Sequence, residues 1–321
     1  MDYNYVRMRN ARSAGDKALE EHYKKLLERG MNTADDSRAL TYVIVLLAAV
    51  AVILGMYILF TEITDNGIAE AAGGLLRAMA EGDGMRVTWV SRVGGRKINE
   101  DAVGKISRNG ITCVAVADGL GGHSAGEIAA KTAIESIFED FSESPEFSRE
   151  ALQKYVTDAH KTVFEKASTD PAYVNMSSTI VVILIKGKRA VWCHAGDSRL
   201  YRFCAGRLEE VTDDHSLAFM DFMEEKIEYD DIRRSENQNK LTNAVGLYIK
   251  DLKVSPVYTA APETNFLLCT DGWWEYVTEN DMEDTLKESK NSREWLEKML
   301  DIRERRAPLG SDNYTAAVIA M

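Results

Sequence analysis

Hydrophobic residues are distributed in two different ways along this chain of 321 residues. Residues 40–60 form one uncharged, apolar run, whereas the chain after about residue 85 shows short apolar runs separated by polar turns. At ~1.5 Å rise per residue, a helix over that first run spans about 30 Å, the hydrocarbon thickness of a bilayer. The pattern predicts a single transmembrane helix at residues 40–60, with a tail at residues 1–39 before it and a glycine-containing linker at residues 61–84 after it.

The tail contains a segment with helical spacing, residues 15–30. Leu19, Tyr23 and Leu26 fall on one side of such a helix, and Glu20 can pair with Lys24. The pattern predicts a short amphipathic helix. A solvated surface helix is one interpretation, and a docking segment that recruits a partner is the alternative.

The chain from residue 85 to residue 321 reads as one domain of strands with two inserted helices. Strands are predicted at residues 87–91, 111–117, 179–185, 190–195, 200–204, 253–259, 266–270 and 314–321. Because strands and helices occur in separate runs, the domain is predicted to be α+β and layered, without an alternating parallel sheet.

Both helices are predicted from capping and spacing. Ser124 followed by Glu127 is a capping box that opens the first helix. The first helix is expected to bury Ile134, Ile137, Phe138 and Phe141, and the second Leu152, Tyr155, Val156, Ala159, Val163 and Phe164.

The amino-acid composition limits the classes of function that are plausible. The formal net charge is −12, and the acidic balance lies after the tail, which argues against a nucleic-acid surface there. Clustered carboxylates suit a metal site better, because bound cations offset their mutual repulsion. The four cysteines form no C-x-x-C pair, so we expect buried thiols in a reducing compartment.

Acidic residues stand where several predicted strands begin or end. Glu100 and Asp101 follow the first strand, and Asp118, Asp197 and Asp271 follow later ones. Asp312 precedes the last strand. A carboxylate at a strand end is held rigidly yet can point into a cleft, and Mg²⁺ and Mn²⁺ prefer oxygen ligands. An Asp-Gly pair alone is a common turn, so only the joint pattern predicts a metal site; the glycines are expected to allow sharp turns there.

Seven segments in order resemble the motif series of the bacterial type 2C metal-dependent serine/threonine protein phosphatases, over roughly residues 85–321. They are RKINED at 96–101, DGLGGH at 118–123, GDSR at 196–199, DHSL at 214–217, LTNAVG at 241–246, TDG at 270–272 and DNYT at 312–315. The resemblance implies a four-layer α-β-β-α sandwich of two antiparallel sheets flanked by helices.

The resemblance also implies roles for individual residues around two Mn²⁺ or Mg²⁺ ions. Asp118 would bridge both ions, the Gly119 carbonyl would bind one of them, and Asp271 and Asp312 would bind the other. Glu100 and Asp101 would hold metal-bound waters. Asp197, with Asp271, would match a weaker third metal position, and Arg96 would bind the substrate phosphate.

The implied reaction is hydrolysis of phosphoserine and phosphothreonine in proteins by direct attack of a metal-bridging hydroxide. Its substrates would be products of a serine/threonine kinase. Leu120 stands where many relatives carry a histidine, so the acid for the leaving group is unassigned. His123, His194 and His215 are interpreted as packing residues, and the acidic segment 214–240 as a solvated face or a filter against acidic phosphopeptides.

Two other readings compete: a catalytically silent sensor that keeps the fold as a binding module, and a membrane adaptor that acts through its tail. The topology is also open. Eight Lys/Arg precede residues 40–60 and only Arg77 lies in the 20 residues after them. The positive-inside rule therefore places the phosphatase domain outside. Free thiols and kinase-made substrates favour the cytoplasm, which we expect.

Overall fold

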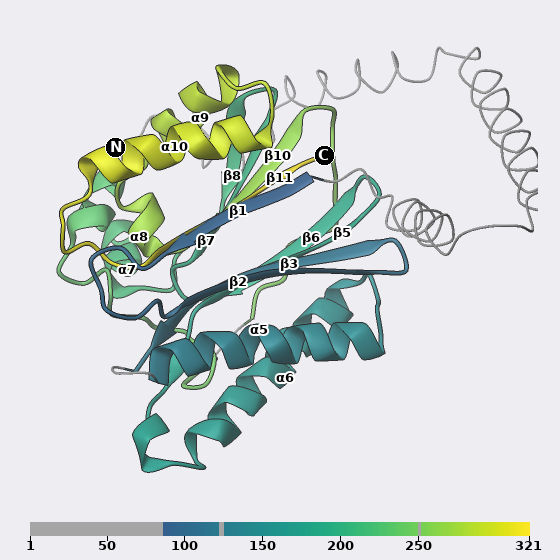
Figure 1. The fold of residues 1–321 in the computed structure, drawn as a ribbon, viewed down its shortest axis with the longest axis vertical. Coiled ribbons are helices and arrows are strands. Elements are labelled where there is room, and N and C mark those ends of the chain that lie inside the picture. Colours follow the sequence, from purple (N-terminus) through teal and green to yellow (C-terminus); the bar gives the residue numbers. More distant parts are fainter. Residues whose placement is uncertain (1–85, 122–124, 250–251) are drawn as a thin grey trace, which may run out of the picture. The chain divides into compact units, whose positions relative to one another are not determined.

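Two antiparallel sheets face each other in the computed structural model, which describes residues 86–121, 125–249 and 252–321 (Figure 1). The first sheet has the order β1–β11–β10–β7–β8, with the bounds β1 Arg86–Arg92, β11 Tyr314–Ala320, β10 Thr264–Cys269, β7 Arg199–Cys204 and β8 Arg207–Val211. The second has the order β2–β3–β5–β6–β9, with β4 paired to β3; the bounds are β2 Asp101–Arg108, β3 Ile111–Leu120, β5 Ile180–Lys186, β6 Arg189–Ala195, β9 Tyr258–Thr259 and β4 Ser177–Ser178.

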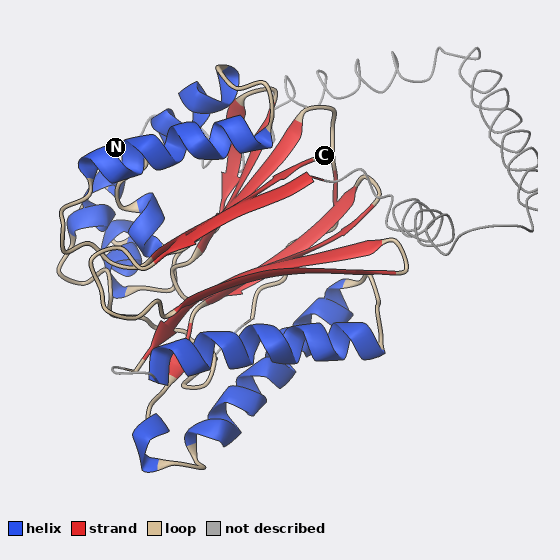
Figure 2. Ribbon diagram, viewed as in Figure 1, coloured by secondary structure: helices blue, strands red, loops and turns tan. Residues whose placement is uncertain are grey.

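Helices cover the outer face of each sheet (Figure 2). The helices α5 (Ala125–Glu143) and α6 (Arg149–Ala167) pack against the second sheet, and α9 (Glu279–Lys287) and α10 (Ser292–Arg306) lie on the side of the first. Shorter elements are α7 (Leu217–Met223), α8 (Asp271–Trp274), and the 3₁₀ turns η1 (Pro171–Tyr173) and η2 (Tyr229–Arg234). The predicted arrangement of two antiparallel sheets flanked by helices is therefore confirmed.

The hydrophobic core has three layers, which explains the long apolar runs of the central strands. On β3, Cys113 and Ala115 face the helices, while Val114 and Val116 face the other sheet. Both faces of such a strand are covered, so its sequence is continuously apolar and does not alternate. The third layer lies between the first sheet and its helices and is built around Trp273 and other aromatic side chains.

Most predicted strands are present, but residues 253–259 are not one strand. Only Tyr258–Thr259 pairs regularly there, and Val254 makes an isolated bridge to Cys193. The prediction also missed β2 and β8. In β2, Gly104 interrupts the apolar pattern because the Phe138 ring of α5 occupies the space where a side chain would stand; a Cβ there would lie 2.6 Å from that ring.

Both predicted helices are present as α5 and α6, whereas α7, α8, α9 and α10 were not predicted. The expected burial of Phe164 is wrong, since its side chain is 55% exposed and stacks on His160. Ser124 and His123 lie outside the described residues. Cys113, Cys193 and Cys269 are buried free thiols, as expected, whereas Cys204 is a free thiol that is partly exposed, contrary to the prediction.

Within the described part of the chain, no helix has the length and apolar character needed to cross a bilayer. The predicted transmembrane helix at residues 40–60, the tail at residues 1–39 and the linker at residues 61–84 lie outside the described residues.

Candidate metal centre

Two of the predicted site residues are neighbours across a strand ladder. Asp101 begins β2 and is the direct antiparallel partner of Asp118 on β3. The amide of Asp118 donates to Thr179 Oγ1 at 2.9 Å, and its carbonyl accepts from the Thr179 amide at 2.8 Å. These contacts make the positions of both carboxylates a consequence of sheet register.

The other two predicted ligands come from the facing sheet, beyond the ends of β10 and β11. Asp271 is the first residue of α8, and Asp312 lies two residues before β11. Thr270 joins the two sheets, because its Oγ1 donates to Asp101 Oδ2 at 3.0 Å and accepts from the Thr315 amide at 3.0 Å. The strand ends that the sequence marked with carboxylates therefore meet at one edge of the sandwich.

The glycines after Asp118 and Asp271 serve close packing, not the sharp turns that we expected. Neither has a positive φ: Gly119 lies within β3 and Gly272 within α8. A Cβ on Gly119 would lie 1.9 Å from the Gly126 carbonyl oxygen, and one on Gly272 would lie 2.0 Å from the Asn313 carbonyl oxygen. Each glycine thus lets a ligand-bearing segment touch its neighbour's backbone.

The electrostatics of this edge favour a cation. Burial, with the neighbouring Asp271 and Asp101 carboxylates, holds the pKa of Asp118 well above its ordinary range. Burial raises the pKa of Asp101 to about 8, with Asp271 adding to the shift, and burial together with Asp312 raises the pKa of Asp271 to about 6. Mutually repelling buried carboxylates take up protons unless a cation neutralises them.

Buried oxygen atoms without hydrogen-bond partners show whether this group of residues fits a divalent metal ion. Glu100 Oε1 and Asp101 Oδ1 are buried and have no hydrogen-bond partner in the described part of the chain. The Glu100 carboxylate and the Gly119 carbonyl oxygen both lie beside Gly126, within 2.6 Å of where its Cβ would stand. Buried oxygens without partners are costly in the absence of a ligand, so this donor set fits a hard cation such as Mg²⁺ or Mn²⁺.

Within the described residues, no three His, Cys, Asp or Glu side chains converge closely enough to hold a metal unaided. Hard cations such as Mg²⁺ retain several waters and take only one or two protein carboxylates each, so tight convergence of three side chains is not required.

Arg96 lies at the mouth of this edge on an exposed loop. Its Nη2 donates to Asp312 Oδ2 at 2.7 Å, and its side chain is 55% exposed. Asn313 holds the loop in place, because its Nδ2 donates to the carbonyls of Val93 and Ile98 and its Oδ1 accepts from the Glu100 amide. Asn313 is part of the DNYT motif at residues 312–315, but the sequence pattern did not indicate this role.

Asp197 belongs to the same group through its electrostatics. It is buried, and burial together with Asp271 raises its pKa well above the ordinary range. Its carbonyl oxygen accepts from the Trp274 indole at 2.9 Å, which ties it to α8. The eight predicted site residues therefore all lie at this edge, and among the described residues Arg96 and Asp312 are the two of them that pair with each other as a salt bridge.

Glu275 is a residue of this edge that sequence reasoning missed. It lies one helical turn after Asp271, and its Oε1 accepts from Gln238 of segment 214–240 at 2.6 Å. Burial and Asp271 raise its pKa to about 7. The sequence did contain one indication of this role: Glu275 stands four residues after Asp271, so in a helix the two side chains lie on the same face.

The predicted packing roles of two histidines are confirmed. His194 lies in β6, is 7% exposed and stacks on His215 with ring centroids 4.5 Å apart. His215 Nδ1 accepts from the Gly196 amide at 3.2 Å. Burial, with His194 beside it, lowers the pKa of His215 to about 3, so the ring is neutral and unsuited to act as the acid for the leaving group.

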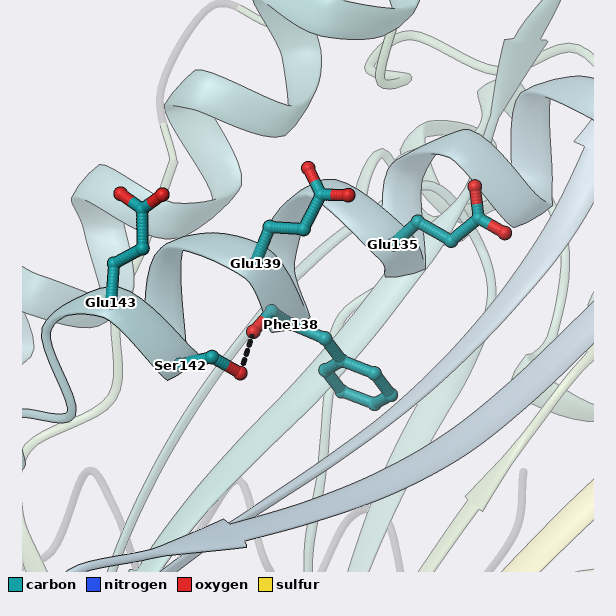
Figure 3. Close-up of a pocket in the computed structure, with 5 residues that line it drawn as sticks. All are labelled: Glu135, Phe138, Glu139, Ser142 and Glu143. Carbon is teal, nitrogen blue, oxygen red and sulfur yellow. Dashed lines mark hydrogen bonds between the residues drawn. The ribbon is translucent and has the colours of Figure 1, made fainter.

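A surface hollow on α5 is separate from this centre. It is lined by Glu135, Phe138, Glu139, Ser142 and Glu143 (Figure 3). The Phe138 ring points towards the strands, and the Ser142 hydroxyl donates to the Phe138 carbonyl at 2.6 Å. None of the predicted site residues lines it.

Comparison with known proteins agrees with this geometry. A family model described as protein phosphatase 2C matches residues 91–309. The serine/threonine phosphatase stp of Listeria welshimeri is 29% identical over 233 residues, covering 70% of this chain and 90% of the relative.

Solved structures similar to this chain are also serine/threonine phosphatases. The serine/threonine phosphatase PstP/Ppp of Mycobacterium tuberculosis is 25% identical with a TM-score of 0.66, covering 74% of this chain and 98% of that structure. A PstP catalytic domain in complex with two manganese ions is 25% identical with a TM-score of 0.65, covering 74% and 97%. The chain belongs to the protein phosphatase 2C family.

Proposed function

We propose that this protein is a metal-dependent phosphatase that hydrolyses phosphoserine and phosphothreonine in proteins. The observation that carries the proposal is the group of buried carboxylates from both sheets, beside one exposed arginine. Relatives named serine/threonine phosphatases cover most of this chain's described part and support the substrate class. The presence of every predicted carboxylate favours catalysis over a silent binding module.

Residue roles follow from position. Asp118, the Gly119 carbonyl, Asp271 and Asp312 would bind two Mn²⁺ or Mg²⁺ ions directly. Glu100 and Asp101 each have a buried oxygen without a partner among the described residues and would hold the water ligands. Asp197 and Asp271 together would form a weaker third position. When bound, the metals lower the pKa of water and so supply a nucleophile near neutral pH.

Arg96 would bind the phosphate of the substrate. A guanidinium presents paired donors that match phosphate oxygens, and Arg96 is exposed enough to reach a protein surface. Its bond to Asp312 aims it at the carboxylate group. Charge on the phosphoryl oxygens would thus be stabilised by a donor that the enzyme holds in place before substrate arrives.

The test is hydrolysis of p-nitrophenyl phosphate by the purified full chain with Mn²⁺, compared with EDTA and with Asp118→Asn. We expect activity only with metal and loss of activity in the variant. Metal-independent activity, or none in a folded protein loaded with metal, would contradict the proposal. A serine phosphopeptide measured against a tyrosine phosphopeptide then tests the substrate class.

A second part of the proposal concerns location: residues 40–60 anchor the enzyme in a membrane, joined through residues 61–84 to a phosphatase domain at residues 85–321 in the cytoplasm. The uncharged run supports the anchor, and free thiols support the cytoplasm. A single Cys placed in the linker of a Cys204→Ser background should resist an impermeant thiol reagent in intact cells. Labelling there would place the domain outside, as the positive-inside rule predicts.

A further inference from the structure

Arg303 is a buried arginine on α10 that no motif pointed to. Its side chain is almost fully enclosed, with 3% of the residue exposed. Nε donates to the Gly272 carbonyl at 3.0 Å, and Nη2 donates to Ser311 Oγ at 2.9 Å and to the Asp312 carbonyl at 3.3 Å. One guanidinium therefore bonds to two separate segments of the chain.

Both segments carry a carboxylate of the metal centre. Gly272 directly follows Asp271, and Ser311 directly precedes Asp312. The β10–β11 ladder ends at the pair Cys269 and Ala316, so strand register does not extend to either carboxylate. Beyond the ladder, Thr270 bonds to Thr315 and Gly272 touches the Asn313 carbonyl. Arg303 adds a donor that both segments share, on the side of α10.

The orientation of this guanidinium is fixed. Its Cζ lies 3.4 Å from the centre of the Tyr314 ring, which holds the guanidinium by a cation–π contact. All three hydrogen-bond acceptors are uncharged oxygens, so these bonds fix the direction of the guanidinium. The planar fork can reach acceptors on two segments at once, which a single ammonium point charge does less well.

We propose that Arg303 is a positioning residue of the metal centre, which sets the spacing between Asp271 and Asp312 by bonding to the backbone beside each. The proposal rests on the metal-dependent activity proposed above. Groups that orient metal ligands from behind typically change metal affinity by about 10–100-fold when removed.

The experiment measures Mn²⁺ binding by the purified full chain with isothermal titration calorimetry. We expect Arg303→Met to weaken Mn²⁺ binding by about 10-fold or more. Arg305→Met is the matched control, because Arg305 is on the same helix with a side chain that is 68% exposed, and it pairs along that helix with Asp301. It should change the affinity less than about 2-fold, as for a surface pair.

Two milder variants cover the case in which Arg303→Met fails to fold. Arg303→Lys keeps the charge and should bind Mn²⁺ with intermediate affinity, and Ser311→Ala removes one of the three contacts and should weaken binding by about 3-fold. In activity assays, each should need more Mn²⁺ for half-maximal rate while reaching a near wild-type rate at saturation.

Wild-type Mn²⁺ affinity in folded Arg303→Met overturns the proposal. So does wild-type affinity in both milder variants if Arg303→Met is unfolded. Absence of Mn²⁺ binding in the wild-type chain would instead overturn the metal-dependent function itself, so the two failures are distinguishable.

Discussion

The two halves of the candidate metal centre are built in different ways. In the ladder half, formed by β2 and β3, Asp101 and Asp118 are register partners whose positions follow from main-chain pairing. In the loop half, formed by the start of α8 and residues 307–313, Asp271 and Asp312 lie beyond their ladder. There the Arg303 side chain bonds to the backbone beside both carboxylates, and the Asn313 side chain ties the segment to the Val93 carbonyl. A rigid sheet can thus position one set of ligands, while the facing set depends on individual side chains.

The largest expected effect comes from replacing the proposed metal-binding aspartates, and it tests whether both halves contribute equally to activity. Asp118→Asn and Asp271→Asn should each lower kcat/KM by about 10³-fold, because each removes a charge that stabilises the bound metals. Asp101→Asn should cost only about 10–100-fold, as expected for a residue that acts through water. Steady-state kinetics with p-nitrophenyl phosphate at saturating Mn²⁺ measures this. Equal losses in Asp101→Asn and Asp118→Asn would reject the division of roles.

The next effect is on stability and uses the two glycines. Gly119→Ala should lower the free energy of unfolding by about 3 kcal/mol, because its Cβ would meet the Gly126 carbonyl at 1.9 Å between a strand and a helix. Gly272→Ala faces Asn313 at 2.0 Å, but its neighbour lies in a loop that can shift, so the cost should be about 1–2 kcal/mol. Urea unfolding of both variants gives the comparison, with Gly310→Ala as the control, because a Cβ there would meet nothing within 4 Å and Gly310 has no positive φ. A larger loss of unfolding free energy in Gly272→Ala than in Gly119→Ala would mean that the loop half, and not the ladder half, is the more rigid.

Side-chain crosslinks should matter in the loop half and little in the ladder half. Asn313→Ala leaves two carbonyls and one amide without their partner, so we expect a loss of about 2–3 kcal/mol. Thr112→Val removes a single hydroxyl contact with Ser107 across β2 and β3 and should cost under about 1 kcal/mol. Thermal unfolding of the two variants checks the difference, and similar losses would contradict it.

The smallest effect concerns pH at the stacked histidines, which join β6 to the loop before α7. Because the pKa of His215 falls from 6.5 to about 3 on folding, the unfolded chain takes up a proton first. The contribution of neutral His215 to the free energy of unfolding is therefore fully present above about pH 6.5 and is lost as the pH falls towards 3. From pH 7 to pH 5 the wild type should lose about 1–2 kcal/mol more than His215→Asn, which keeps a side-chain acceptor.

Urea unfolding at the two pH values measures this difference. The carboxylates whose pKa values are raised on folding change the stability in the opposite direction. They are present in both proteins, so their effect cancels in the comparison. A His215→Asn chain with the same acid slope as the wild type would show that the ring is not the group responsible.

Much of the fold could be read from local patterns, and the failures have physical causes. The continuous run of β5 and the helical spacing of α6 were found because both bury whole faces. β2 was missed because Gly104 accommodates a ring from α5, and residues 253–259 were taken for a strand because apolar residues there pack without pairing. The helix α10 was missed although Trp295 and Met299 have helical spacing, since charged residues fill most of its length.

What the sequence determined by itself is the chemistry: carboxylates at strand ends, an arginine before the first of them, and a motif order that identifies the family. Such features are local, because a strand end and its flanking residues adjoin in the chain. The tertiary structure decided which groups hold them. Thr270 reaches Asp101 across 169 residues and Asn313 reaches Val93 across 220, and neither separation leaves a periodic trace in the sequence. Arg303 and the close approach at Gly119 became visible only in the packed structure, because their roles depend on contacts and not on residue type.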